Sequence, residues 1–357
     1  MDKKNPNFSI CIPNYNYGNY IGDTIESVLN QTYQHFEIII VDNASTDDSV
    51  DIIKSFKDNR IKLFLNEYNI GFAPNLQRAT GYAQNDFINL LSSDDQMNPT
   101  ALEFYTEAIR QLWDYKEKLY IVSDIEEFGD NGKTTRLTTK SPNSFARVEY
   151  THGALSNSRA PYDIYSGIEA LTDGLSRLSN IGGFCSTVYS KSLWESVEGY
   201  NSVRTISPDT HFALKALTKD PVVVHINKPL FRYRIQISDN RASLTKNVRI
   251  QMDQYLDTLE FATKEIFSLT GMNANKIQRM FITKNCLEKS LSNIALGNYI
   301  LAFKILAFAF ATYPSKTFIN YKTYIITALL ITGPLAKFIA SPLRTIYIKI
   351  RNGKNER

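Results

Sequence analysis

The sequence has few cysteines and little net charge. It therefore does not resemble a disulfide-rich protein or a strongly basic nucleic-acid binder. The three cysteines, Cys11, Cys185 and Cys286, lie far apart, and the chain contains no Cys-x-x-Cys pair. We therefore expect neither a disulfide framework nor a cysteine metal motif, which fits a reducing compartment. A formal net charge of +4 over 357 residues does not indicate a general nucleic-acid binder.

Two kinds of apolar segment are also missing. The amino terminus, Met1–Pro6, leads into a predicted strand without an apolar signal segment. The strongly apolar stretch 324–336 is shorter than the roughly 20 residues that span a bilayer as a helix. We therefore expect a cytoplasmic protein, either free in solution or at the inner face of the cytoplasmic membrane.

Short apolar stretches alternate with helical patterns in the first part of the chain. The stretches lie at residues 8–12, 36–41, 61–65 and 86–91, and Ile21–Gln31 shows the apolar spacing of a connecting helix. Strands that alternate with helices predict βαβ units. The fold class expected is α/β, with a mostly parallel twisted sheet flanked by helices.

The later part of the chain has weaker signals. Gly129–Asp163 is rich in Gly, Ser, Thr and Asn and is expected to form an insertion or long loop. A helix is predicted at 209–217 and a strand at 222–226. These elements complete a predicted main domain of residues 1–248, which we divide near residue 125.

Residues 249–357 are predicted to form a separate helical region. Apolar residues recur at helical spacing in Gln251–Leu269 and Ile277–Leu296. The apolar stretch 324–336 is followed by basic residues such as Lys337 and Arg344. Contact with an anionic membrane surface explains this pattern, and so does burial against the main domain, and the sequence favours neither.

Polar residues follow three of the predicted strands at the point where each strand ends. Asn14 and Tyr15 follow the first strand, Asp42 ends the second, and Asp94 and Asp95 follow the fourth. Ligands bind beyond the carboxyl ends of the strands in open α/β sheets, so we expect these residues to meet at one crevice. The first turn lacks the Gly-x-Gly-x-x-Gly of a dinucleotide-binding dehydrogenase and offers hydrogen bonds and an aromatic face instead.

The adjacent carboxylates Asp94 and Asp95 are poorly suited to core packing. Acidic pairs at such an edge commonly hold a hard divalent cation, which in turn binds phosphate oxygens. The alternative is a solvated acidic turn before the helix that begins near Asn98. Together with the other two polar clusters, the first interpretation predicts a site for a nucleotide with a metal-bound diphosphate.

These motifs, taken together, resemble those of the inverting glycosyltransferase family 2. The resemblance covers roughly the first half of the chain, through residues 12–16, 25–33, 37–47 and 69–75 and the aspartate pair. It implies the GT-A fold, a nucleotide-diphospho-sugar donor, with a UDP-sugar expected, and Mg²⁺ or Mn²⁺ as cofactor. It also implies a set of donor-binding residues, namely Pro13, Asn14, Tyr15, Asp42, Ser93 and Asp94.

The chain departs from the family pattern at the metal motif. The family's Asp-x-Asp falls on residues 92–94, so Ser92 replaces the first aspartate and leaves its ribose contact open. Asp94 keeps the position of the metal-binding carboxylate, and Asp95 is a second candidate ligand.

A basic segment lies where many relatives complete the metal site with a histidine. Gln236 occupies that neighbourhood here. Arg232 and Arg234 are candidate contacts of the diphosphate, because guanidinium groups match phosphate oxygens. The alternative is a solvated basic face.

Inverting transfer needs a base that takes the proton from the acceptor hydroxyl. The family supplies it from an acidic pair at the start of a helix, well after the metal motif. Ser207–Lys215 has that form, with Asp209 as the candidate. The alternative is that Asp209 caps its helix beside Pro208, and one side chain could do both. His211 and His225 are predicted to be structural.

The resemblance implies a hexosyl- or N-acetylhexosaminyl-transferase of bacterial surface-polysaccharide synthesis (O-antigen, capsule or exopolysaccharide). Its acceptor would be a saccharide or lipid-linked saccharide, with no nucleic-acid partner. Residues 1–125 would bind the nucleotide sugar, residues 126–248 the acceptor, and residues 249–357 are a candidate membrane-associating region. Two alternatives stay open: a nucleotidyltransferase, which would release pyrophosphate, and a non-catalytic nucleotide-sugar-binding or membrane scaffold protein.

Overall fold

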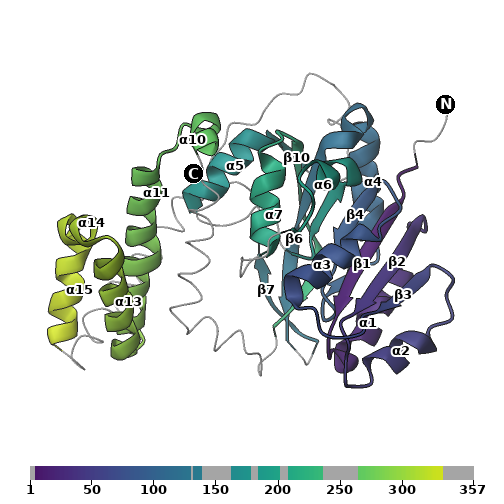
Figure 1. Ribbon diagram of the computed structural model, residues 1–357, viewed down its shortest axis with the longest axis horizontal. Helices are drawn as coiled ribbons and strands as arrows, with labels where there is room; N and C mark the ends of the chain where they lie inside the picture. The colour runs from purple at the N-terminus through teal and green to yellow at the C-terminus, as the bar shows by residue number, and fades with distance from the viewer. Residues whose placement is uncertain are drawn as a thin grey trace. The chain divides into compact units, whose positions relative to one another are not determined.

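The chain divides into two compact units, which are described separately (Figure 1). Unit 1 comprises residues 1–174 and 179–239, and unit 2 comprises residues 175–178 and 240–357. The predicted boundary at residue 248 and most of the predicted insertion lie outside the described residues, and both stay predictions. The structure, a computed structural model, describes residues 5–129, 132–138, 162–177, 184–201, 208–235 and 264–332.

Unit 1 begins with parallel strands joined by helices, as the alternation in the sequence predicts. Their order in the sheet is β3-β2-β1-β4, and every pair among them is parallel. β1 and β2 are buried along almost their whole length, which accounts for their continuous apolar residues. The elements are β1 (Phe8–Asn14), α1 (Gly18–Leu29), β2 (Phe36–Asp42), α2 (Ser49–Ser55), β3 (Ile61–Leu65), α3 (Phe72–Gly81) and β4 (Phe87–Leu90).

The sheet continues beyond β4 with mixed strand directions. The order is β4-β9-β6-β10-β5, with β7 beside β6 and β8 beside β10. β9 is antiparallel to both of its neighbours, whereas β6 and β10 are parallel. The elements are β5 (Gln96–Met97), α4 (Ala101–Gln111), the 3₁₀ helix η1 (Trp113–Lys118), β6 (Leu119–Phe128), β7 (Thr134–Thr138), β8 (Tyr162–Ser166), α5 (Gly167–Arg177), β9 (Thr187–Ser190), α6 (Lys191–Ser196), α7 (Pro208–Leu217) and β10 (Val222–Arg234).

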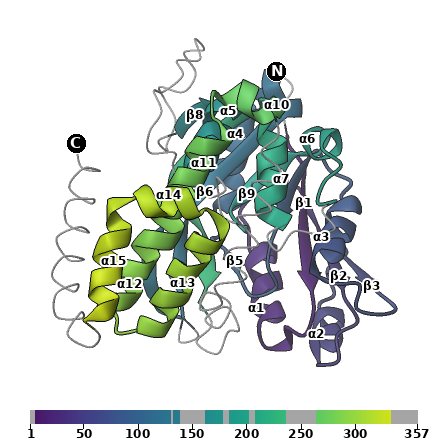
Figure 2. The same cartoon turned by 60° about the vertical axis from the view of Figure 1, so that its left-hand side comes forward.

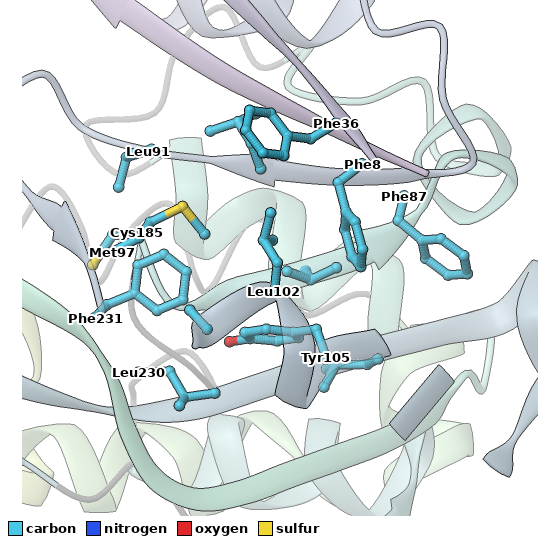
Figure 3. Packing of buried hydrophobic residues seen from close by; sticks show 14 of the residues in the cluster. Phe8, Phe36, Phe87, Leu91, Met97, Leu102, Tyr105, Cys185, Leu230 and Phe231 are labelled. Atoms are coloured by element: carbon cyan, nitrogen blue, oxygen red, sulfur yellow. The ribbon is translucent and has the colours of Figure 1, made fainter. Parts of the chain in front are cut away.

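One apolar cluster joins the two parts of this sheet. Figure 3 shows side chains from β1, β4, α4 and β10 gathered in it. The rings of Tyr105 on α4 and Phe231 on β10 meet edge to face with centroids 6.1 Å apart. The Tyr105 hydroxyl donates to the Ser186 carbonyl oxygen at 2.7 Å, which satisfies its polar end inside the core. The α/β prediction is confirmed, with a sheet that is parallel through β1–β4 and mixed beyond them.

The described part of unit 2 is helical, as predicted. α12, α13 and α15 lie against one another (Figure 2). Of the helices that the structure describes, none combines the length and apolar character needed to cross a membrane. The elements are α10 (Lys264–Thr270), α11 (Ala274–Met280), the π-helical segment η3 (Phe281–Glu288), α12 (Lys289–Ala295), α13 (Tyr299–Thr312), α14 (Pro314–Ile319) and α15 (Tyr321–Ile331).

Candidate active site

The carboxyl ends of β1, β2 and β4 bring most of the predicted donor residues together. Asn14 and Asp42 are register partners at the ends of β1 and β2, and Asn14 Nδ2 donates to Asp42 Oδ1 at 2.7 Å. On the other side of β1, the Ser93 hydroxyl donates to the Pro13 carbonyl oxygen at 3.0 Å. Parallel pairing with β1 therefore joins residues from three separate stretches of sequence into one crevice edge.

Asp42 organises the turn that follows β2. Its carboxylate accepts from the Ser45 hydroxyl at 2.6 Å and from the Ser45 backbone N–H at 2.8 Å. The same hydroxyl accepts from the backbone N–H of Asn16 at 2.9 Å, which ties the turn to the segment after β1. Tyr15 lies in that segment with 41% of its surface exposed, so its ring is available to a ligand. Sequence reasoning missed Ser45, although it lies within the matching stretch 37–47.

A network of asparagine side chains supports the same edge from behind. Asn43 Oδ1 accepts from Asn66 Nδ2 and from the Ile70 backbone N–H, both at 2.9 Å. Asn66 Nδ2 also donates to Asn75 Oδ1 at 2.9 Å, and Asn43 Nδ2 donates to Asn69 Oδ1 at 2.8 Å. These bonds hold the loop between β3 and α3 against the end of β2, which gives Asn69 and Asn75 of the family motif a structural role.

The aspartates of the acidic motif lie in a buried turn after β4. Asp94 is 3% exposed and Asp95 is fully buried. The Thr24 hydroxyl on α1 lies 2.9 Å from the carbonyl oxygens of both Ser93 and Asp95. Asp95 Oδ1 accepts from the backbone N–H of Arg234 at 2.9 Å. Both predicted metal ligands are therefore buried, and the Asp95 carboxylate is bonded to the main chain of β10 through Oδ1.

Cys185 lies close to this turn. Burial raises the pKa of its thiol well above the usual value, and the negative charge of Asp95 adds to the shift. Asn89 on β4 donates from Nδ2 to the Cys185 carbonyl oxygen at 2.7 Å, which holds the segment before β9 against β4. The thiol is thus protonated and packed, as expected for a structural cysteine.

Both arginines proposed for the diphosphate donate to protein groups. Arg232 Nη1 donates to Gln96 Oε1 at 2.7 Å, and its Nη2 donates to the Gly132 carbonyl oxygen at 2.8 Å. Arg234 Nε donates to the Asp94 carbonyl oxygen at 3.0 Å. These bonds attach the end of β10 to the acidic motif and the adjoining β5.

The residues at the acidic motif fit a divalent cation that arrives with its diphosphate. Within the described ranges, no three His, Cys, Asp or Glu side chains gather into a metal-binding group. Mg²⁺ is usually held by one or two carboxylates together with waters and substrate phosphates, so Asp94 and Asp95 are the residues that could hold such a cation. Gln236, which stands where relatives carry a histidine, lies outside the described residues.

Asp209 lies in the first turn of α7. It belongs to residues 126–248, the half of the domain that is predicted to bind the acceptor. Its charge contributes to the raised pKa of Tyr120 and of Tyr200, after the larger effect of burial. The Phe212 ring, one turn along α7, stacks on Tyr200 with centroids 4.5 Å apart. A carboxylate in the first turn is stabilised by the helix dipole. Asp209 is a half-buried carboxylate whose charge acts on the buried residues Tyr120 and Tyr200.

The two histidines of this region have different surroundings. Burial, followed by the nearby Lys215, lowers the pKa of His211, which keeps the imidazole neutral near pH 7. His225 is fully buried on β10, with Nε2 2.8 Å from Asp124 Oδ1. Asp163 lies on its other side, with an oxygen 3.9 Å from Nδ1. This cluster joins β6, β8 and β10, and no spacing in the sequence indicates it.

Comparison with known proteins relates this site to sugar transfer. Residues 9–153 match the sequence profile of Glycosyl transferase family 2. An Escherichia coli UDP-Glc:alpha-D-GlcNAc-diphosphoundecaprenol beta-1,3-glucosyltransferase, WfaP, is 46% identical over 87 residues, 24% of this chain and 35% of that protein. Glycosyltransferase GlyG of Streptococcus pneumoniae is 33% identical over 105 residues, 29% of this chain and 35% of that protein. The chain thus covers about a third of the length of these two relatives.

A solved structure matches nearly the whole chain in fold. Staphylococcus aureus TarS 1-349, in complex with UDP-GlcNAc, aligns over 97% of this chain and 92% of its own, with a TM-score of 0.50 and 18% identity. At that identity the likeness concerns the fold alone, which is the GT-A fold that the sequence motifs predict. The prediction of fold class is confirmed.

Proposed function

Since the chain carries a glycosyltransferase family 2 domain over residues 9–153, we propose that it transfers a sugar from a nucleotide-diphospho-sugar to an acceptor hydroxyl with inversion. The observation that carries this proposal is the meeting of Asn14, Asp42, Ser93 and Asp94 at the carboxyl ends of three adjacent strands. An open α/β sheet binds its ligand at this edge. The donor nucleoside would lie along β1 and β2, with its diphosphate toward the end of β4.

Separate residues would recognise the nucleoside of the donor and neutralise the charge of its diphosphate. Tyr15 offers an exposed ring to the base, while Asn14 and Asp42 fix the shape of the pocket beside it. The residue that would hold the cation is Asp94. A bound Mg²⁺ or Mn²⁺ would offset the charge that develops on the leaving nucleoside diphosphate.

In the proposed reaction, Asp209 takes the proton from the acceptor hydroxyl. The acceptor oxygen forms a bond to the anomeric carbon from one side while the bond between that carbon and the diphosphate oxygen breaks on the other. A carboxylate with restricted hydration suits this role, since general bases are tuned by their surroundings. The reaction has no covalent sugar–enzyme intermediate, and the anomeric configuration inverts in a single step.

We place the reaction in the synthesis of a bacterial surface polysaccharide. The name of the E. coli relative gives a UDP-glucose donor and an acceptor attached to diphosphoundecaprenol. A UDP-sugar and a lipid-linked saccharide are therefore the substrates to test first. Such an acceptor would bring the enzyme to the inner face of the cytoplasmic membrane.

Unit 2 is the proposed region of membrane contact. Several large apolar side chains on α13–α15 are exposed, including Ile319 at 80% and Ile331 at 81%. Residues 333–357 contain six lysines and arginines against one glutamate, a charge balance that favours an anionic lipid surface. The proposed occupant of this apolar surface is an anionic bilayer.

Vesicle flotation tests the membrane contact. The double substitution F318D/I319D in α14 should reduce binding to phosphatidylglycerol-containing vesicles by at least about tenfold, because each exposed apolar side chain contributes up to a few kcal/mol when buried. Leu65→Asp, at a 56% exposed position of unit 1, serves as the control and should bind as the unaltered protein does. Equal binding by all three proteins would rule out α14 as the contact, and binding by none would rule out the membrane.

A product assay tests the proposed reaction class. The protein is incubated with Mn²⁺, a panel of UDP-sugars and GDP-sugars, and a lipid-diphosphate-linked saccharide, and the released nucleotides are separated by chromatography. Glycosyl transfer releases nucleoside diphosphate, a nucleotidyltransferase would release pyrophosphate, and a binding scaffold would release neither. The anomeric configuration of the product, read by NMR, tests inversion.

A further inference from the structure

Arg234 is a buried arginine beside the acidic motif. It is the last residue of β10 and only 6% exposed. A buried guanidinium is strongly destabilising unless neighbouring groups satisfy it. Its partners therefore indicate what the side chain is for.

The hydrogen bonds of Arg234 go to both aspartates of the motif. Nε donates to the Asp94 carbonyl oxygen at 3.0 Å, and the backbone N–H donates to Asp95 Oδ1 at 2.9 Å. The Asp94 carbonyl and the Asp95 carboxylate thus each have a bond to the same residue. This pair of bonds ties both aspartates of the turn to the end of β10.

The guanidinium group is also enclosed by aromatic rings. Its central carbon lies 4.7 Å from the centroid of Tyr20 on α1 and 4.5 Å from that of Phe128 on β6. Nη2 lies 3.4 Å from Asp23 Oδ2, one turn of α1 further on. To reach a diphosphate, the side chain would have to leave both rings and the ion pair.

The main chain of β10 approaches the motif along a defined path. β10 shifts register against β6 between Ile226 and Phe231, and its last part then pairs with β5. Asn98, directly after β5, extends this pairing, because its backbone N–H donates to the Leu230 carbonyl oxygen at 2.9 Å. Arg234 thus reaches Asp94 from a strand end that is held independently of any ligand.

We propose that Arg234 is a positioning residue of the donor site. It holds the Asp94 main chain and the Asp95 carboxylate in the turn where the cation of the nucleotide complex would bind. Asp95 then serves as an anchor and Asp94 as the single metal-binding carboxylate. This inference rests on the proposed function, since it assumes a metal-bound diphosphate at Asp94.

The experiment measures UDP binding by calorimetry, with and without Mn²⁺, and compares it with UMP binding. Arg234→Gln should weaken Mn²⁺-dependent UDP binding by about 10- to 100-fold, as the loss of an outer-shell partner does at metal sites. Binding of UMP and metal-free binding of UDP should stay within about twofold of the unaltered protein. Arg234→Lys, which keeps the charge but not the forked geometry, should show an intermediate loss.

Arg60→Gln is the matched control. Arg60 also stacks on an aromatic ring, at 4.4 Å from the Phe36 centroid, and pairs with Asp58 at 2.7 Å, but it precedes β3 and so lies at the amino end of the strands. The control should bind UDP with and without Mn²⁺ as the unaltered protein does. Circular dichroism at the assay temperature shows which variants are folded, and Arg234→Lys decides the question if Arg234→Gln is not.

Three outcomes separate the possibilities. Loss of metal-free UDP affinity with unchanged UMP affinity would make Arg234 a diphosphate ligand and overturn the inference. Mn²⁺-dependent UDP binding equal to that of the Arg60→Gln control would also overturn it. If the unaltered protein itself shows no Mn²⁺-dependent UDP binding, the proposed donor site fails, and the inference fails with it.

Discussion

The proposed donor and acceptor sides of unit 1 are built in different ways. On the donor side, polar groups bond to one another across strand ends, as Asn14 does to Asp42 and Ser93 to the carbonyl of Pro13. On the acceptor side, Asp209 stands at a helix start beside aromatic residues such as Tyr120. The proposed donor site is a network in which one change would affect several residues, whereas the proposed base would act as a single group.

The largest effect on activity is expected from the substitution of Asp94, the residue that would bind the cation of the donor. Asp94→Ala removes the carboxylate that would bind the metal, and the loss of several kcal/mol of transition-state stabilisation corresponds to about a 10³-fold lower kcat/KM. The dependence of the remaining activity on Mn²⁺ concentration should disappear, which a metal titration measures. Asp95→Asn is the companion variant. If Asp95 is an anchor, its variant should keep the Mn²⁺ dependence and lose stability.

A substitution at Asp209 should affect one step alone. Asp209→Asn removes the proposed base, so kcat should fall by about 10²-fold or more, while the Kd for UDP stays unchanged. Steady-state kinetics combined with calorimetry measures both quantities. Full activity in a folded Asp209→Asn protein would exclude this residue as the base. If the Asp209→Asn protein also loses UDP affinity, Asp209 contributes to donor binding, and the proposed donor and acceptor residues do not act separately.

The donor side could be predicted further from the sequence than the acceptor side, for a physical reason. β1, β2 and β4 are buried parallel strands, so their apolar residues are continuous, and their functional residues follow directly in the chain. The antiparallel position of β9 between β4 and β6 depends on pairing between distant segments, which local patterns do not encode. The sequence predicted the helix that begins near Asp209, but not the nearby buried residues Tyr120 and Tyr200.

The acidic motif shows how little sequence adjacency says about contacts. Asp94 is the predicted metal ligand and its neighbour Asp95 a second candidate, and both assignments stay predictions. Asp95 bonds to Arg234 through its carboxylate, whereas Asp94 bonds to the same residue through its carbonyl oxygen. The bond from Arg234 to Asp95 spans 139 positions in the sequence, so no spacing rule connects them. The sequence pointed to Arg234 as a candidate diphosphate contact, but it did not predict the protein groups that the Arg234 side chain contacts.

A third test examines the opposite, amino ends of the same strands. Glu37 on β2 accepts from the Ser9 hydroxyl at 2.5 Å and from Lys62 Nζ at 2.7 Å. Burial alone would raise the pKa of Glu37, but hydrogen bonds from Lys62, Ser9 and the Gln84 backbone outweigh it and lower the pKa below 4.5. The ionised carboxylate therefore stabilises the fold above about pH 4.5, and this contribution is lost as pH falls through the lowered value.

Glu37→Gln should therefore lower the free energy of unfolding by about 1–3 kcal/mol at pH 7. The difference from the unaltered protein should shrink as the pH falls from about 4.5 through the lowered pKa, below which Glu37 is protonated in both states. Urea unfolding of both proteins, at pH 7 and at successively lower pH, measures this difference in the free energy of unfolding. UDP affinity at pH 7 should be unchanged, since the cluster lies at the other end of the strands. A difference that is constant with pH would show that the charge of Glu37 does not contribute.

The smallest effect is expected in the turn that follows β2. Ala44 has a φ of 61°, in the left-handed region that favours glycine. Left-handed backbone costs about 1–2 kcal/mol for a residue with a Cβ, and glycine loses about 0.5–1 kcal/mol more backbone entropy on folding. Ala44→Gly should therefore raise the free energy of unfolding by about 0.5–1 kcal/mol, measured by urea unfolding.

The control for Ala44→Gly is the same substitution in a helix. Ala73→Gly in α3 should lower the free energy of unfolding by up to about 1 kcal/mol, because glycine is a poor helix former. Opposite signs for the two substitutions would show that the turn after Asp42 is strained in the folded protein. If Ala44→Gly stabilises the fold but weakens UDP binding, the strained turn contributes to the shape of the donor pocket. Equal destabilisation by both would mean that the network around Asp42 and Ser45 does not hold this turn in a strained conformation.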